Sequence, residues 1–211
     1  METALKVKKT DTDLSVLDSL SIDRLFTICD WQDIAHSPWK AEYPYEPRVR
    51  FQIVHSAAKI YIRYTVEEEY VKAQYVRPNE NVWEDSCVEF FISLDDRQTY
   101  YNFEFNVLGT GLIGYGIANK AERKRLDPML VEQIDTFTQV FKVNGKKSWD
   151  ITLAIPKTIF SGQLKSGVPV AANFYKCGDK LPEPHFMAWN NINSPTPNFH
   201  QPQFFGEVIF E

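Results

Sequence analysis

Short runs in which apolar and polar residues alternate recur along most of the chain. These runs are rich in β-branched and aromatic residues and are separated by turn-forming clusters, a spacing typical of an antiparallel sandwich or barrel. We expect an all-β protein, an antiparallel β-sandwich of the immunoglobulin-like or jelly-roll-like kind, with one or two short helices. The predicted strands are Leu25–Cys29, Val49–Val54, Lys59–Thr65, Ser86–Leu94, Thr99–Val107, Gly111–Ile117, Phe137–Lys142, Ser148–Ile155, Pro169–Lys176, His185–Trp189 and Gly206–Phe210.

Helix is the minority element in this pattern. The segment Ile155–Phe160 suits a short helix that is entered through Pro156 and closed near Gly162. An Asn-Gly pair at the centre of Lys142–Lys147 is a strong signal for a hairpin turn. Loops fixed by a β scaffold are common places for binding residues, and two segments that break the alternation are expected to be such loops: Glu67–Asn81 and Asn190–Pro202.

The sharpest local prediction is a hairpin formed by Ser86–Leu94 and Thr99–Val107. The four polar residues between the two runs suit a loop built around a type I turn. If the last residue of the first run pairs with the first residue of the second, every apolar position on one face meets an apolar partner. A slip by one residue would break that agreement. This register places Glu89 opposite Glu104 on the second face.

These facing carboxylates have two interpretations. Like charges directly opposite each other destabilise a sheet by up to about 1 kcal/mol, so a structural network needs a compensating cation, such as Arg63 or Arg50 on a neighbouring strand. In a functional site, a ligand supplies the compensation. Carboxylates on a pleated surface can bond sugar hydroxyls, coordinate a hard cation such as Ca2+, or share a proton as an acid and base pair. The pattern alone favours neither interpretation.

Size and composition favour one domain. The 211 residues, 44% of them hydrophobic, are enough for one well-buried core, and no shift in composition or long Ser/Gly linker divides them. We expect a single domain over residues 1–211, with residues 1–17 as a poorly ordered or extended N-terminal arm. Aromatic residues make up 14% of the chain, which suits both strands and ligand platforms.

Charge and cysteine usage narrow the possible partners. The net charge of −5 gives no field that favours nucleic acid, and no groove-reading motif accompanies the one basic cluster, Lys120–Arg125. We expect that cluster to be a solvated loop or a short helix. The three cysteines, Cys29, Cys87 and Cys177, are odd in number and widely spaced, so their spacing indicates neither a zinc site nor a disulfide framework.

No stretch of the sequence reaches membrane-spanning length, so we expect no membrane insertion. The charged N-terminal residues are not followed by the apolar run of about 7–15 residues that a secretory signal needs. The protein is therefore expected to be intracellular, or extracellular or periplasmic if the numbering begins after a removed leader. The sequence leaves this choice and the oligomeric state open.

Three segments taken together resemble carbohydrate-binding module family 9, in particular its family 9-like, DOMON-related β-sandwich domains. They are Trp83–Phe91 (WEDSCVEFF), Tyr101–Asn106 (YNFEFN), and Trp189 followed by Phe199–Gly206 (FHQPQFFG). The similarity runs from about residue 18 to residue 211. It implies a β-sandwich that binds an oligo- or polysaccharide without catalysis, in some members at the end of a glucan or xylan chain.

The resemblance also implies a site that stacks a sugar ring between two aromatic side chains while polar strand residues bond its hydroxyls. Trp83 matches the first aromatic, and Phe199 falls where the second is typically Trp. Glu89 and Asn106 match polar contact positions. Glu104 stands where the best-known members carry Arg, which reverses the local charge, so the sugar specificity does not carry over. We expect these five residues to bind the ligand and no residue to be catalytic.

A cofactor is expected only in the form of Ca2+, which some family members bind through acidic loops. The resemblance does not assign its ligands residue by residue. The acidic residues available in this chain are Asp95, Asp96 and Glu67–Glu69.

Two other functions remain open. Glu89 and Glu104 at facing positions could suit the carboxyl spacing of about 5–5.5 Å that a retaining glycosidase needs, although the chain carries no strong nucleophile motif. Some related sandwiches bind haem, which needs Met or His as axial ligands. The available side chains, which no spacing singles out, are Met129, Met187, His185 and His200.

Overall fold

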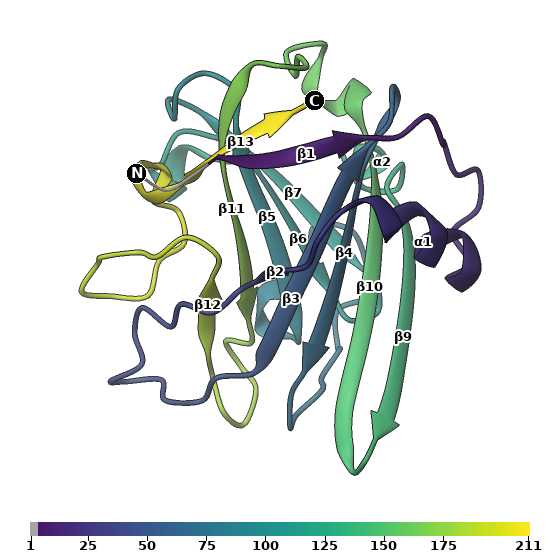
Figure 1. Ribbon diagram of the computed structural model, residues 1–211. Helices are drawn as coiled ribbons and strands as arrows, with labels where there is room; N and C mark the ends of the chain where they lie inside the picture. Colours follow the sequence, from purple (N-terminus) through teal and green to yellow (C-terminus); the bar gives the residue numbers. More distant parts are fainter. Residues whose placement is uncertain (1–3) are drawn as a thin grey trace.

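Two β-sheets packed face to face, and joined along one edge by strand β1, form the protein in the computed structural model, which describes residues 4–211 (Figure 1). The strands follow the order β8-β7-β6-β5-β11-β13-β1-β3-β4-β10-β9. We call β8 through β13 in this order the site sheet, and β3 through β9 the back sheet. β12 adds to β11, and β2 adds to β3. The predicted all-β sandwich is therefore confirmed.

The strands of this sandwich are mostly five to eleven residues long. The two α-helices of the described residues are α1 (Ser19–Leu25) and α2 (Pro128–Val131). The strands are β1 (Leu5–Lys9), β2 (Gln32–Asp33), β3 (Arg48–His55), β4 (Lys59–Glu67), β5 (Cys87–Ser93), β6 (Tyr100–Asn106), β7 (Gly111–Gly116), β8 (Lys124–Arg125), β9 (Asp135–Val143), β10 (Lys146–Pro156), β11 (Pro169–Cys177), β12 (Phe186–Ala188) and β13 (Gly206–Phe210).

The main core lies between the two sheets, because alternate residues of each strand point inward. On the site sheet, Val88, Phe90 and Ile92 of β5 are completely buried. Across the interior, Phe51 of β3 stacks on Phe174 of β11, with ring centroids 3.8 Å apart. The intervening residues of β5 face the opposite side of the site sheet, where a second, smaller cluster of buried apolar side chains covers part of the sheet.

The predicted hairpin register is confirmed. β5 and β6 pair with Glu89 opposite Glu104, and the apolar partners meet on the core face as expected. The connecting turn uses positive φ angles of 55° at Asp96 and 68° at Arg97. The second predicted hairpin, β9–β10, also forms, and its Asn-Gly turn has φ angles of 52° and 85°, as a type I′ turn requires.

The strand predicted at Leu25–Cys29 is wrong. The chain there ends helix α1 and continues as a 3-10 turn, Phe26–Ile28. The helix begins because the Asp18 side chain accepts a hydrogen bond from the backbone N–H of Ser21 at 3.0 Å. Its buried residues, Ile22, Leu25 and Phe26, follow helical spacing.

The N-terminal arm is extended where it is described. Residues 5–7 of β1 pair in parallel with β13, and residues 8–9 pair in parallel with β3, so β1 joins the two sheets (purple in Figure 1). Residues 1–3 of the predicted arm lie outside the described residues. The predicted helix at Ile155–Phe160 is a 3-10 turn, Lys157–Phe160. Among residues 4–211, no helix is long and apolar enough to cross a membrane.

Candidate functional site

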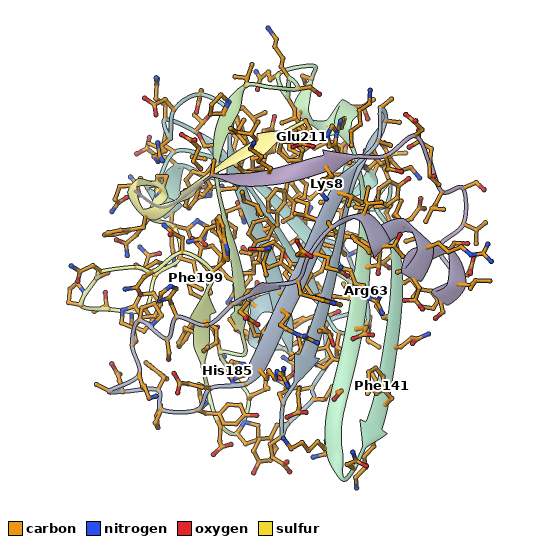
Figure 2. All side chains as sticks on the ribbon, in the orientation of Figure 1. Lys8, Arg63, Phe141, His185, Phe199 and Glu211 are labelled. Carbon is orange, nitrogen blue, oxygen red and sulfur yellow. The ribbon has the colours of Figure 1, made fainter. Side chains whose placement is uncertain are left out.

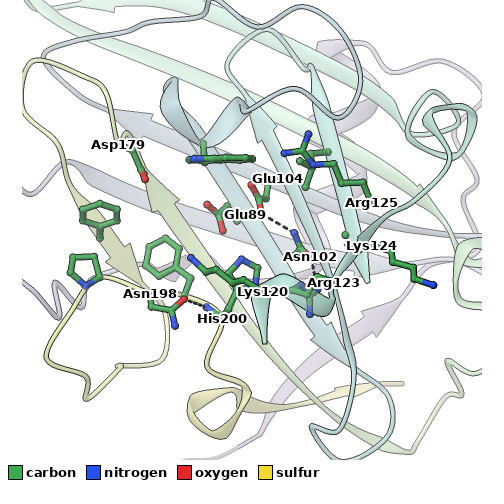
Figure 3. Close-up of a pocket in the computed structure, with 16 residues that line it drawn as sticks. Glu89, Asn102, Glu104, Lys120, Arg123, Lys124, Arg125, Asp179, Asn198 and His200 are labelled. Atoms are coloured by element: carbon green, nitrogen blue, oxygen red, sulfur yellow. Dashed lines mark hydrogen bonds between the residues drawn. The ribbon is translucent and has the colours of Figure 1, made fainter. Parts of the chain in front are cut away.

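A cavity of about 310 Å³ opens on the face of the site sheet that points away from the main core (Figure 3). Glu89 of β5, Asn102 and Glu104 of β6 and Gly114 of β7 line its floor. Side chains from residues 120–125, from the loop 197–200 and from Trp83, Phe186 and Asp179 complete the lining. The cavity thus brings together four of the five predicted site residues: Trp83, Glu89, Glu104 and Phe199.

The two facing carboxyl groups are buried, with Glu89 and Glu104 each only 4% exposed. Burial raises the pKa of Glu104 to about 7, although a hydrogen bond from Asn102 opposes the shift. Burial and, after it, the charge of Glu104 raise the pKa of Glu89 well above its usual range. Burial likewise raises the pKa of Asp179, at the rim, to about 6. Near neutral pH the pair therefore holds at least part of a proton and can both donate and accept hydrogen bonds.

Partial protonation of Glu89 and Glu104 lowers the repulsion between their carboxyl groups, which explains how the two can face each other. The cations considered from the sequence do not compensate them, because Arg50 and Arg63 belong to β3 and β4 of the back sheet (Arg63 in Figure 2). There Arg63 pairs with Asp23 at 2.7 Å. Neither arginine offsets the pair, because the neighbours of the hairpin in its sheet are β11 and β7.

Asn102 is held in one orientation at the cavity floor. Its side-chain N–H donates to Glu104 Oε1 at 2.8 Å, and its Oδ1 accepts a hydrogen bond from Arg123 (dashed lines in Figure 3). Gly114 lies opposite Asn102 in β7, and a Cβ added there would lie 2.4 Å from Asn102 Oδ1. A glycine at this position therefore leaves the room that the amide needs.

The basic segment 120–125 lines the cavity, which sequence reasoning missed. Arg123 donates to the backbone oxygens of Gly116 and Tyr100 at 2.8 and 3.0 Å, and its guanidinium lies 3.8 Å from the centre of the Tyr100 ring. Arg125 donates to the side chain of Asn81 at 3.1 Å. The predicted short helix is present as an exposed 3-10 helix at Lys120–Glu122, but the prediction is wrong for residues 124–125, which form edge strand β8 against β7. A count of charges could not show this pairing.

The two predicted aromatic walls, Trp83 and Phe199, differ in how much of each ring is accessible to a ligand. Trp83 is half-buried at the rim, with the Arg125 guanidinium 5.5 Å from its ring centre. Phe199 is only 7% exposed, because its ring stacks face to face on Tyr175 with centroids 4.1 Å apart and planes at 6°. One face of Phe199 is thus already covered. A third aromatic, the half-buried Phe186, lines the cavity as well.

Asn106 does not line the cavity, and the structure separates it from the other predicted site residues. It is fully buried at the end of β6. Its amide donates to the backbone of Tyr75 at 2.9 Å and to Asp85 at 3.0 Å, while its oxygen accepts from the N–H groups of Leu108 and Thr110 at 3.1 Å. Its hydrogen-bonding groups are already occupied in shaping the turn after β6.

The acidic residues considered for Ca2+ are engaged elsewhere. Asp95 caps the β5–β6 turn by accepting from the N–H and hydroxyl of Thr99, at 2.9 and 2.6 Å, and Asp96 pairs with Arg97 at 3.2 Å. Each residue of Glu67–Glu69 forms an ion pair with a lysine. Ca2+ binds through about six to eight oxygen ligands, and these pairings do not gather them.

The four residues considered as haem ligands lie in separate surroundings. Met187 is 3% exposed in the main core, whereas Met129 is 74% exposed. His200 lines the cavity and bonds the Tyr100 hydroxyl through Nδ1 at 2.8 Å. His185 is buried and bonds Lys176 through Nε2 at 2.8 Å. No pair among them presents the two free axial ligands that a haem would need.

We expect Glu104→Gln to reduce the loss of stability that the wild-type protein shows between about pH 4.5 and 7. The pKa of Glu104 is about 7 in the folded protein and 4.5 ordinarily, so the folded protein holds more protons in this window. Stability therefore falls as pH rises through it, by an amount on the order of 3 kcal/mol at about 1.4 kcal/mol per pKa unit. Urea unfolding in metal-free buffer containing EDTA measures the effect.

The control for this experiment is Glu132→Gln, which changes an exposed carboxylate outside the cavity. Its stability should follow the wild-type pH profile. If Glu104→Gln also follows that profile, Glu104 does not carry a raised pKa.

Three comparisons relate the sequence and fold of this chain to known proteins. The chain matches the family model of carbohydrate-binding family 9 over residues 20–210. A crystal structure from Bacteroides uniformis ATCC 8492, of a protein provisionally assigned as carbohydrate-binding, is 35% identical, with a TM-score of 0.88 and 99% coverage of both chains. No curated protein sequence matches the chain.

Two further structures share the fold at low sequence identity. Both are of a family 9 carbohydrate-binding module from Caldicellulosiruptor kristjanssonii, one in complex with glucose and one with cellotriose. Each is 11% identical to this chain and aligns with 99% of it, covering 96% and 94% of the module, with TM-scores of 0.65 and 0.63.

A β-sandwich with a polar, aromatic-lined cavity on the outer face of one sheet defines a ligand-binding module. Its cavity floor is built from rigid strands, and loops supply the rim. The chain belongs to carbohydrate-binding family 9. Its function is carbohydrate binding without catalysis, so the resemblance found in the sequence is confirmed and the binding module is favoured over the glycosidase.

Proposed function

We propose that the cavity over β5, β6 and β7 binds the terminal sugar unit of a glucan or xylan chain. The observation that carries this proposal is the placement of the Trp83 ring beside a polar floor made of Glu89, Asn102 and Glu104 in one cavity. Phe199 and Phe186 add apolar surface on the lining. Asn106 has no part in the proposed contact set, because its hydrogen bonds are internal to the protein.

This combination suits the chemistry of a pyranose ring. The apolar C–H face of the sugar gains about 25 cal/mol for each Å² buried against a flat aromatic ring. Its hydroxyl groups both donate and accept hydrogen bonds, and they lose free energy when buried without partners. The raised pKa values of Glu89 and Glu104 supply donors as well as acceptors on the floor. The amide orientation of Asn102, fixed by Arg123, adds a rigid partner.

Size and similarity support a short ligand. A volume of about 310 Å³ lies at the small end of ligand pockets, which span roughly 300–1,000 Å³. Such a cavity suits one or two sugar units rather than a long polysaccharide segment. The Caldicellulosiruptor kristjanssonii modules, which share the fold, are complexed with glucose and with cellotriose.

Calorimetric titration with a length series tests the proposal. Glucose, cellobiose, cellotriose and cellohexaose, with the matching xylose series, are the ligands, and galactose and mannotriose serve as comparison sugars. A site for the chain end predicts that affinity rises up to about two units and then stays level. Affinity that keeps rising with length indicates an internal binding mode, and no binding of either series contradicts the proposed ligand class.

A further inference from the structure

Two cysteine thiols and a carboxylate meet beneath the floor of the cavity. Cys177 of β11 lies directly opposite Cys87 of β5, and Glu89 follows Cys87 by two residues on the same face of the strand. One ligand atom from each of the three side chains lies within 4.8 Å of the others. The Cys177 thiol donates to Glu89 Oε1 at 3.1 Å.

We propose that Cys87, Cys177 and Glu89 form a binding site for a thiophilic divalent cation of the Zn2+ type. This site shares Glu89 with the floor of the sugar cavity, but it does not rest on the proposed sugar specificity. The spacing of the cysteines along the sequence gave no sign of it, because 87 and 177 are brought together only by the pairing of β5 with β11.

The geometry is close to what a tetrahedral ion needs. Zn2+ binds thiolate sulfur at about 2.3 Å and carboxylate oxygen at about 2.0–2.2 Å, so neighbouring ligand atoms are separated by roughly 3.5–3.8 Å. The ligand atoms here lie at most 4.8 Å apart, and Cys177 Sγ and Glu89 Oε1 are 3.1 Å apart. Small side-chain rotations therefore bring all three atoms to one ion, and paired strands hold their backbones in place.

A fourth position and a route of entry are both available. Glu89 and Asp179 line the cavity, while the two thiols are almost completely buried behind them. An ion entering from the cavity would therefore meet Glu89 first, and its fourth ligand would be a water molecule from the cavity.

The donor set selects the kind of cation. Two sulfur ligands and one oxygen suit a borderline-soft ion such as Zn2+, whereas Ca2+ and Mg2+ prefer oxygen alone. On binding, each thiol releases its proton to solvent and becomes a thiolate, and Glu89, whose pKa is also raised, releases any proton it holds and becomes a carboxylate. Burial opposes this change without an ion, since it raises the pKa of Cys87 to about 12. A bound dication also offsets the repulsion between Glu89 and Glu104 across the hairpin.

Cobalt binding to the reduced full-length chain tests this site. Co2+ is the probe because it replaces Zn2+ in thiolate sites and becomes visible there. We expect one Co2+ per chain, with near-ultraviolet thiolate charge-transfer absorption and visible tetrahedral bands that Zn2+ then bleaches. Cys87→Ser and Cys177→Ser should each weaken or abolish the charge-transfer absorption. Cys29→Ser, which alters the remaining free thiol, is the matched control and should match wild type.

Glu89→Gln keeps both thiols and serves as a second variant. It should retain the charge-transfer absorption but bind Co2+ about tenfold or more weakly. Circular dichroism in metal-free buffer establishes that each variant is folded. A thiol titration that finds three free thiols in wild type confirms that the protein is reduced. The proposal is overturned if this reduced wild type shows no charge-transfer absorption with Co2+, or if the absorption survives in the Cys87→Ser, Cys177→Ser double variant. A Cys87–Cys177 disulfide that persists under reducing conditions overturns it as well.

Discussion

Trp83→Ala is expected to lower the affinity for a bound sugar by about 10- to 100-fold. Removing the indole takes away the largest flat apolar surface that is half-exposed at the rim of the cavity. Burial of a large apolar side chain is worth roughly 1.5–3 kcal/mol, and each 1.4 kcal/mol is a factor of about ten in the dissociation constant. Calorimetry with the tightest-binding oligosaccharide measures the change.

Trp31→Ala is the matched control for this experiment. Trp31 is also half-buried and also has arginine beside its ring, with the Arg50 guanidinium 4.8 Å from the ring centre, but it does not line the cavity. Its replacement should leave the affinity unchanged within about twofold. Equal losses in the two variants, or no loss in Trp83→Ala, would remove Trp83 from the binding platform.

The largest loss of stability is expected from Glu68→Ala, at about 3–5 kcal/mol. Glu68 and Lys176 form an ion pair at 2.9 Å in which both side chains are fully buried, and Trp149 donates to Glu68 Oε1 at 2.7 Å. Removing the carboxylate leaves a buried ammonium group without its counter-charge and an indole N–H without its acceptor, which is strongly destabilising. His185 cannot replace the carboxylate, because its imidazole carries no negative charge; burial and Lys176 lower its pKa to about 2 and keep it neutral.

The neighbouring glutamates provide matched controls within the same sequence. Glu67 pairs with Lys146 at 2.6 Å and Glu69 with Lys147 at 3.3 Å, and all four of these side chains are at least one-third exposed. Exposed ion pairs contribute about 0–1 kcal/mol, so Glu67→Ala and Glu69→Ala should cost less than about 1 kcal/mol by urea unfolding. Similar values for all three variants would show that the Glu68–Lys176 pair does not stabilise the fold as a buried charge pair.

The hairpin shows what the sequence makes predictable. Its two runs, at residues 86–94 and 99–107, alternate so regularly that only one register pairs every apolar residue with an apolar partner. That register places Glu89 opposite Glu104, as the structure has them. The placement of Trp83 and Phe199 followed from family resemblance, and both residues line the same cavity.

The parts that the sequence did not predict depend on contacts between distant segments. Residues 120–125 form a mostly exposed basic run, yet Lys120, Arg123, Lys124 and Arg125 also line the cavity, because residues 124–125 pair with β7 as β8. Asn106 shares a face with Glu104, but the turn after β6 and Asp85 take up its hydrogen-bonding groups. The strand expected at residues 25–29 does not form, because helix α1 ends at Leu25 and continues as a 3-10 turn. The residue that caps this helix, Asp18, lies outside residues 25–29.

A crystal structure of the protein with cellotriose or xylotriose tests the central claim most directly. The account predicts one terminal sugar unit in the cavity, with its ring against Trp83 and its hydroxyl groups bonded to Glu104 and Asn102. A sugar bound elsewhere, for example against Trp31 and Arg50 on the back sheet, with the cavity over β5, β6 and β7 left free, would contradict it.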